Sequence, residues 1–538
     1  MRGAFILGVA AIASKLLGSV YTVVLQNLIG DRGMGLYQMA YPVYATLLVI
    51  STAGFPVAVS KYVSEYTALG DVGTARRIYR VSLALLAAIG FVCAVGLYFG
   101  AGFFARLSGD RSAVYAIQAI APALFIVPAM SSMRGYFQGW QMMTPTAVSQ
   151  VVEQLVRVAT ILAGAYAVIH MGFDAATAAA TAAFGAVSGG VAGGAAMGYY
   201  FWRYRDPHHL AAVGRVAPHE RPGRERLGSA AILRRLLYYA IPVSLGALVI
   251  PLTSNVDALT VTNLLKQQGI TQAAATSGFG LLAGRAFKLM MLPAALAGSI
   301  GTALMPSVSQ AHALRDARDT SARILLGLRV AILFSLPAAA GLFILGRPID
   351  IALFRNAAGY RSIQILGAAT FFSSVQIALA ASLQGLGRVY APLGSLVIGT
   401  ALKVALNFIL VPRYGIDGAA IATSVSYAVA AALNFLSVAK LMRMKTMLAS
   451  HFVKPAMATF VMGAVTFAVY NQWQRMAFAL PLRISAAFVT VLTIAVGAPV
   501  YGFMLVLVGA VGEQELIVVP KVGPLLARTF RKLGVLAR

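Results

Sequence analysis

Long apolar segments recur from residue 4 to residue 511, separated by short breaks that carry charged residues, glycine or proline. A helix that crosses the hydrocarbon core of a bilayer needs about 20 mainly apolar residues. Fourteen segments approach that length: 4–28, 36–58, 80–105, 113–138, 145–169, 175–202, 232–264, 277–311, 320–345, 360–385, 390–411, 417–440, 453–472 and 484–511. With 59% hydrophobic and only 11% charged residues in 538, the chain has more apolar length than one soluble core can bury. The sequence therefore predicts an all-α integral membrane protein.

The first segment could be a cleaved secretory signal or a retained helix. Arg2 precedes an apolar run with small residues near Ala13, as in a signal. Lys15 interrupts that run early, however, and hydrophobicity resumes to Leu28. We therefore interpret the segment as a retained spanning helix.

Cysteine and histidine usage argues against metal or redox chemistry. Cys93 is the only cysteine, and the six histidines show no ligand spacing. We expect no metal site, no catalytic residue and no enzyme activity.

Basic residues gather in alternate connections between the segments. If the N-terminus is cytoplasmic, the inward-facing connections hold most of them, in the stretches 61–80, 203–235, 315–323, 440–454 and 521–538. The positive-inside rule then predicts that both termini are cytoplasmic, in a bacterial cell membrane. The net charge of +27 fits attraction to anionic inner-leaflet lipids, at ~1 kcal/mol per juxtamembrane basic residue, better than binding to nucleic acid.

Short motifs of the first half return in the second half at a nearly constant offset. The matched sets are Gln138-Gly139, Pro145 and Arg157 with Gln384-Gly385, Pro392 and Lys403; Pro56 and Ser60 with Pro306 and Ser309; and ALGDVGTARRI at 68–78 with ALRDARDTSARI at 313–324. They predict two pseudo-symmetric six-helix bundles with the same orientation and a substrate site between them. The predicted parts are a first bundle at 1–203, a cytoplasmic linker at 204–231, a second bundle at 232–445, helices 13 and 14 at 446–511, and a basic cytoplasmic tail at 512–538.

Several ionisable residues lie inside the predicted spans, where an isolated charge at the bilayer centre costs at least ~3 kcal/mol. We assign five cations to a candidate substrate-binding set: Lys15, Arg157, Arg285, Lys288 and Lys403. Only Glu153 and Asp257 oppose them in charge, and with Asn255, Gln150 and Gln154 these acids form a candidate coupling or polar network. The excess of cations predicts a hydrated site for an anion such as phosphate or pyrophosphate.

Structural alternatives remain open for these residues. Glu153 and Arg157 are four apart and could form a local ion pair on one helix. Arg285 or Lys288 could reach the outer interface. Asp257 could pair with a basic side chain or bind a coupling cation.

Three stretches carry a family resemblance: ASKLLGSVYTVVLQNLIGDRGMGLYQMAYPVYATLLVISTAGFPVAVSKYVSE at 13–65, RGYFQGWQMMTPTAVSQVVEQLVRV at 134–158, and PAALAGSIGTALMPSVSQA at 293–311. They resemble the SpoVB and YtgP type of the MurJ flippases, in the MOP exporter superfamily. The resemblance implies a MATE-like fold and outward movement of an undecaprenyl-pyrophosphate-linked peptidoglycan precursor, lipid II. It also implies a role in cell-wall and polysaccharide biosynthesis, cell shape or sporulation, with cell-wall synthesis proteins as partners.

The resemblance extends to individual charged positions. Lys15 and Lys288 stand where this family has cavity arginines. Two features depart from the proteobacterial members: Tyr21 matches a second basic residue of the first helix, and residues 34–44 contain no acid. Both features point to the Gram-positive, spore-forming branch.

Other functions would share such a fold. One alternative is a flippase for another lipid-linked oligosaccharide, and another is a MATE-type drug/cation antiporter, for which an acid-dominated site is expected. A third is a scaffold for wall-synthesis enzymes, which would not need embedded cations. We expect no cofactor, and no nucleotide-binding motif is present to supply energy. The drive would come from a Na⁺ or H⁺ gradient, the membrane potential or consumption of the product outside.

Overall fold

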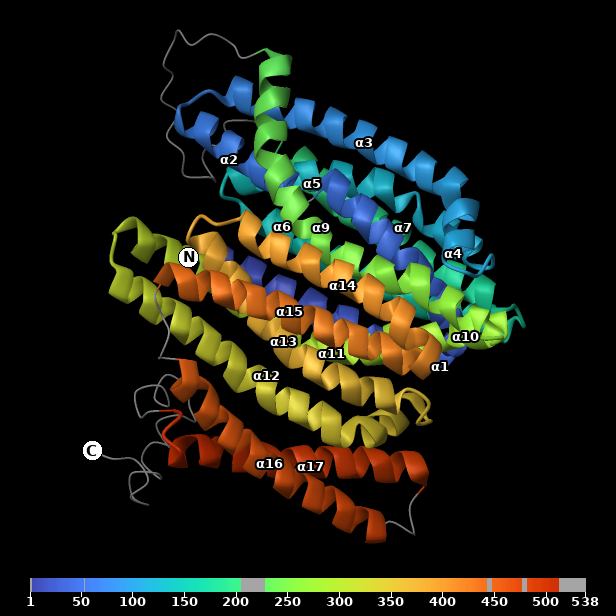
Figure 1. The fold of residues 1–538 in the computed structure, drawn as a ribbon. Helices are drawn as coiled ribbons and strands as arrows, with labels where there is room; N and C mark the ends of the chain where they lie inside the picture. The colour runs from blue at the N-terminus through green and yellow to red at the C-terminus, as the bar shows by residue number, and fades with distance from the viewer. Residues whose placement is uncertain (1, 53, 205–227, 443–447, 477–480, 512–538) are drawn as a thin grey trace. The chain divides into compact units, whose positions relative to one another are not determined.

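The computed structural model describes residues 2–52, 54–204, 228–442, 448–476 and 481–511 (Figure 1). Up to residue 20 only the backbone is described, Gly18 excepted. The predicted linker lies mostly outside the described residues, and the predicted basic tail lies wholly outside them. The described residues form helices joined by short turns, without strands.

The contacts between Cα atoms divide the chain into two compact units, Met1–Gly284 and Arg285–Arg538. The helices of the first unit are α1 (Arg2–Thr52), α2 (Phe55–Ala68), α3 (Val72–Leu107), α4 (Ala113–Ile120), α5 (Ala123–Gly139), α6 (Met143–His170), α7 (Ala175–Arg203), α9 (Ser229–Gln267) and α10 (Gln272–Gly280). A short π-helix, η1 (Leu281–Ala286), contains the boundary between the units.

The second unit continues from η1. Its helices are α11 (Phe287–Ala313), α12 (Ala317–Phe354), α13 (Tyr360–Gly385), α14 (Tyr390–Tyr414), α15 (Ile416–Met442), α16 (Leu448–Met476) and α17 (Leu482–Leu507). The contacts place α9 with the first unit, whereas the repeat-based organisation places it in the second bundle. The boundaries of the repeat-based organisation stay a prediction.

The number of helices agrees with the sequence prediction. Gly30 has a φ of 72° inside α1, a left-handed conformation that glycine adopts without strain, and it divides α1 into two helices. We count α1 as two helices, divided at Gly30, and take its second part together with α2 as one. We also count α4 with α5 as one helix, and α10, η1 and α11 as one. Counted in this way, the described residues contain fourteen helices. Twelve described segments are long and apolar enough to cross a membrane by length and composition.

The internal repeat is visible in matching local structures. Asp71 and Asp316 occupy the same place in the matched motifs, and each side chain caps the N-terminus of the helix that follows, α3 or α12. The matched glycines also make matching contacts. A Cβ on Gly139 would lie 2.6 Å from the Cβ of Val63, and one on Gly385 would lie 2.9 Å from the Cβ of Val308.

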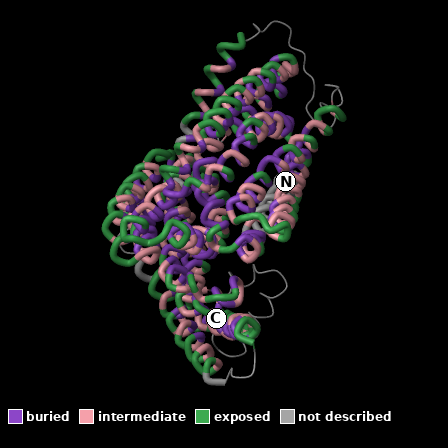
Figure 2. Tube along the Cα trace, turned by 90° about the vertical axis from the view of Figure 1, so that its right-hand side faces the viewer, coloured by how far each residue is buried: buried purple, intermediate pink, exposed green. Residues whose placement is uncertain are grey.

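Each unit has its own apolar core. In the first unit Phe55, Phe137 and Trp140 belong to one buried cluster, and in the second Leu304 and Leu383 belong to another. Other large apolar side chains lie on the outside of the helices. Phe99 is 82% exposed and Phe460 is 79% exposed, and Figure 2 shows exposed residues along many helices. Such exposure suits helices that face lipid.

Candidate functional site

Three charged side chains meet between α5 and α6. Glu153 of α6 accepts a hydrogen bond from Arg157, one turn later, with 2.7 Å between Nη2 and Oε1. Its second oxygen accepts from Arg134 of α5 at 2.8 Å. Arg134 also donates to the hydroxyl of Ser149 through two nitrogens. One carboxylate is therefore shared by two guanidinium groups, and the triad has a net positive charge.

Arg134 is the member that sequence reasoning missed. It lies near the end of a predicted span, where a basic residue is typical of an anchor at the membrane interface. The tight turn after α5, with Gln141 at a φ of 59°, sends α6 back along α5 and brings residue 134 beside residues 149 and 153. The family-like stretch at 134–158 is the signal that could have found it, because that stretch begins at this arginine.

Tyrosines of α1 surround the Arg157 side of the triad. Tyr21 and Tyr44 lie within electrostatic reach of the Arg157 guanidinium, and the hydroxyls of Tyr21 and Tyr37 are 3.2 Å apart. Tyr44 is 2% exposed, and its hydroxyl has no hydrogen-bond partner in the described structure. Tyr21, which the resemblance matches to a basic residue, thus lies near a cation supplied by another helix.

The two predicted glutamines lie on the same helix, α6. The Oε1 atom of Gln150 is buried without a hydrogen-bond partner among the described residues. Gln154 approaches α1, since a Cβ on Gly18 would lie 3.3 Å from its Nε2. Lys15 precedes Gly18 by three residues on α1, but its side chain lies outside the described part. Its predicted role therefore stays a prediction.

Asn255 and Asp257 lie on α9. The amide of Asn255 donates to the Pro42 carbonyl at 3.0 Å and to the Thr46 hydroxyl at 2.7 Å, so it joins α9 to the proline-containing part of α1. These contacts favour a structural role for Asn255. Asp257 is buried.

Arg285 of η1 has a buried carboxylate partner in the second unit. Its Nη1 donates to Asp350 Oδ1 at 2.9 Å, and the two side chains are 2% and 0% exposed. Asn356 accepts a second bond from Arg285, and the backbone N–H of Gly359 donates to Asp350 at 2.7 Å. The guanidinium also lies over the ring of Phe354 at 4.7 Å. These contacts favour a structural role for Arg285, and its predicted substrate contact is untested.

Asp350 was not considered at the sequence level because it lies beyond the predicted span 320–345. The helix α12 in fact extends to Phe354, so the carboxylate is inside it. The other two predicted cations of this unit lie apart in the sequence: Lys288 is half-buried near the start of α11, and Lys403 of α14 is 0% exposed. Both roles stay predictions.

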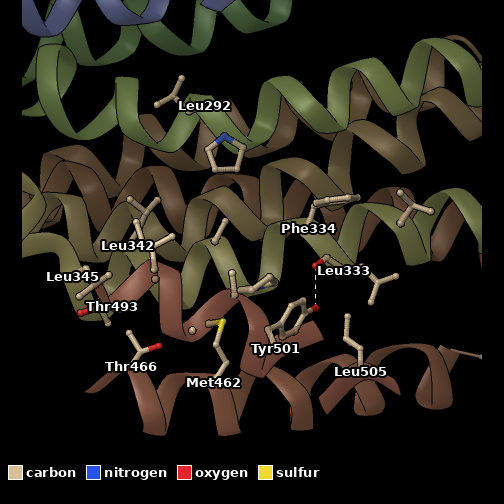
Figure 3. Close-up of a pocket in the computed structure, with 18 of the residues that line it drawn as sticks. Leu292, Leu333, Phe334, Leu342, Leu345, Met462, Thr466, Thr493, Tyr501 and Leu505 are labelled. Carbon is tan, nitrogen blue, oxygen red and sulfur yellow. Dashed lines mark hydrogen bonds between the residues drawn. The ribbon is translucent and has the colours of Figure 1, made fainter. Parts of the chain in front are cut away.

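An apolar cavity of about 950 Å³ lies among α11, α12, α16 and α17 (Figure 3). Leu342, Phe334 and Met462 are typical of its lining. Tyr501 also lines it, and its hydroxyl donates to the carbonyl of Leu333 at 2.9 Å. Arg329, a span residue that sequence reasoning also missed, lines the cavity and donates to the Ala510 carbonyl. The volume and the largely apolar lining suit a long apolar chain.

The described residues contain no group of three or more His, Cys, Asp and Glu side chains that could hold a metal ion. What they offer instead is hydrogen-bond donors with excess positive charge inside helices, together with an apolar cavity. Such groups can bind an anion and an apolar chain.

Two solved structures show what class of protein this fold defines. The lipid II flippase MurJ in an inward closed conformation matches with a TM-score of 0.64 and 14% identity, over 93% of this chain and 98% of that chain. An inward-facing multidrug resistance MATE family transporter of the MOP superfamily matches with a TM-score of 0.65 and 16% identity, over 80% and 96%. The fold is therefore that of the MATE-like membrane transporters.

The sequence comparisons then define the family. A model described as "Polysaccharide biosynthesis protein" matches residues 1–312, so the chain belongs to the polysaccharide biosynthesis protein family. Lipid II flippase MurJ of Bacillus subtilis is 30% identical over 455 residues, which are 81% of this chain and 82% of that protein. The predicted resemblance to the MurJ flippases is confirmed. These relatives are flippases and transporters, and this chain is accordingly a multi-pass bacterial membrane protein and not an enzyme.

Proposed function

We propose that this protein moves a polyprenyl-pyrophosphate-linked peptidoglycan precursor, lipid II, from the inner to the outer leaflet by alternating access. The observation that carries the proposal is the triad in which Glu153 is shared by Arg134 and Arg157. A net positive cluster inside membrane-spanning helices suits the diphosphate of such a substrate, because a phosphate and a guanidinium form charge-assisted hydrogen bonds.

The apolar cavity supports the same substrate class. A polar head needs a hydrated cationic path, since its transfer into hydrocarbon is costly, whereas a polyprenyl chain needs an apolar surface. Arg329, Tyr501, Thr466 and Thr493 are the polar residues of a lining that is otherwise apolar. The resemblance to a protein named lipid II flippase adds support for the particular glycolipid.

The test is complementation of a bacterium depleted of its own lipid II flippase, paired with an assay of outward-exposed lipid II. We expect growth and exposure to return together. Growth without restored exposure would indicate an indirect role, such as a scaffold for wall-synthesis proteins. Failure of both by a well-expressed protein would contradict lipid II as the substrate and favour another lipid-linked oligosaccharide. Resistance to cationic drugs in the same cells would favour the MATE-type antiporter.

The cations that match the family pattern give a second prediction. Lys15→Ala and Lys288→Ala should each lower transport about 10- to 100-fold, the size expected when a charged hydrogen bond to a phosphate is lost. Arg at either position should retain activity, since charge is the shared requirement. Lys440→Ala removes an exposed cation near the end of α15 and is the matched control. Equal transport by all three Ala variants would contradict the assignment.

The proposed orientation has its own test. A reporter fused after Arg538 should score as cytoplasmic, because the basic stretches of alternate connections favour the inner side. An extracellular signal would contradict the proposed arrangement, in which both termini are cytoplasmic.

A further inference from the structure

A second cavity, of about 400 Å³, lies beside the apolar one, among the same helices α12, α16 and α17. Its position follows from the order of the lining residues along each helix. On α12, Leu345 and Ile349 line the apolar cavity, whereas Arg347 and Ile351 line the second one. On α16, Thr466 lines the apolar cavity, and Tyr470 lines the second one. On α17, Thr493 lines the apolar cavity, and Val489 lines the second one. The two cavities therefore follow one another along one groove.

The second cavity differs from the first in its polar groups, which are hydrogen-bond donors. Arg347 contributes an exposed guanidinium that forms no ion pair within the described part of the chain. Tyr470 lies within electrostatic reach of it, and its hydroxyl accepts from Gln474, so its own proton is available. Ser485 accepts from the indole N–H of Trp473 at 3.1 Å, which likewise leaves its hydroxyl proton available.

No acidic residue lines the second cavity together with Arg347. The lining of the second cavity contains no Asp or Glu, and the sequence from residue 418 to residue 512 has none at all. Asp350 is nearby on α12, but it is fully buried and paired with Arg285. No carboxylate that lines this cavity therefore balances the charge of Arg347, and a bound anion would balance it.

The position of the cavity along the helices indicates what kind of anion it would bind. It lies within about two turns of the points where α12 ends at Phe354, α16 ends at Met476 and α17 begins at Leu482. Trp473 and Tyr470 are the residue types that favour the level of lipid headgroups. An anion at this level, next to an apolar cavity of about 950 Å³, describes an amphiphile with an acidic head and a long apolar chain.

We propose that the cavity around Arg347 binds the phosphate or diphosphate head of a polyprenyl lipid in the outer leaflet, as an exit site for the translocated substrate. Under the proposed orientation, α12 runs outward, so Arg347 lies at the outer end and Arg329 at the inner end of the groove. This inference rests on the proposed function for the identity of the lipid. The cation of Arg347 and the two available hydroxyl donors, Tyr470 and Ser485, support the head site itself.

The experiment uses the full-length protein in phosphatidylcholine nanodiscs, with undecaprenyl pyrophosphate as the probe and native mass spectrometry as the readout of binding. Arg347→Gln should weaken binding about tenfold or more, the effect of losing one charged hydrogen bond. Arg347→Lys should stay within about threefold of the parent protein, because it keeps the charge. Arg413→Gln, which removes an exposed arginine at the end of α14 outside the groove, should leave binding unchanged.

Three results would overturn the proposal: no binding by the parent protein, equal binding by Arg347→Gln, or equal binding of phosphatidylglycerol with the same dependence on Arg347. The last result would assign the site to a bilayer phospholipid. The lipid II exposure assay separates this proposal from the proposed function. If the parent protein restores lipid II exposure but its binding of undecaprenyl pyrophosphate does not depend on Arg347, only the exit site is refuted. Arg347-dependent binding without lipid II exposure would refute only lipid II transport.

Discussion

Asp350→Ala is expected to destabilise the protein by about 3–5 kcal/mol and to reduce its level in the membrane. The substitution leaves the Arg285 guanidinium buried without its carboxylate, in a place where both side chains are almost fully inaccessible. It also removes the acceptor of the Gly359 N–H. The measurement is the thermal unfolding midpoint of the purified protein in detergent, together with the amount recovered from membranes.

The same helix supplies a matched control. Asp319 pairs with Arg323 one turn later, at 2.9 Å, but these side chains are 40% and 32% exposed. Asp319→Ala should therefore cost no more than about 1 kcal/mol. The double variant Arg285→Met/Asp350→Asn should recover much of the loss, since no unpaired charge remains and Asn can still accept from Gly359. Equal stability of Asp350→Ala and Asp319→Ala would show that the buried pair does not hold this region.

Glu153→Gln should lower both stability and transport, because it removes the carboxylate that Arg134 and Arg157 share. Two guanidinium groups would then repel one another inside membrane-spanning helices. Breaking a buried pair of this kind costs about 3–5 kcal/mol, and the 13% exposure of Glu153 places the expected loss toward the lower end. The unfolding midpoint and the lipid II exposure assay measure the two effects separately.

The double variant Arg134→Gln/Glu153→Gln separates charge balance from a coupling role. It restores the net charge of the triad, so its stability should recover relative to Glu153→Gln. If Glu153 only balances charge, transport returns to the level of the single variant Arg134→Gln. If Glu153 takes part in ion coupling, the double variant accumulates normally but does not transport. A Glu153→Gln protein as stable and active as the parent would contradict both roles.

The sequence predicted the fold in considerable detail because the signals are local. Spanning helices follow from apolar length, so segment positions such as 360–385 reappear as α13 (Tyr360–Gly385). The internal repeat was equally readable, since Asp71 and Asp316 each cap a helix through contacts within three residues. The i,i+4 pair of Glu153 and Arg157 is another local relation, and it forms as the spacing indicated.

The partners of the charged residues were decided by tertiary structure. Arg134 reaches Glu153 because a tight turn folds α5 against α6, and Arg285 meets Asp350 across η1 and α12. In a membrane-embedded helix every residue faces lipid, a cavity or a neighbouring helix, and periodicity in an almost wholly apolar segment does not distinguish these surroundings. Sequence alone therefore determined that ionisable groups lie within the spans and that cations outnumber acids. Helix packing decided which of these cations have a carboxylate partner. It also decided that α12, α16 and α17 form a groove with Arg347 at one end. Only the tertiary structure could decide these relations, because they join residues far apart in the chain.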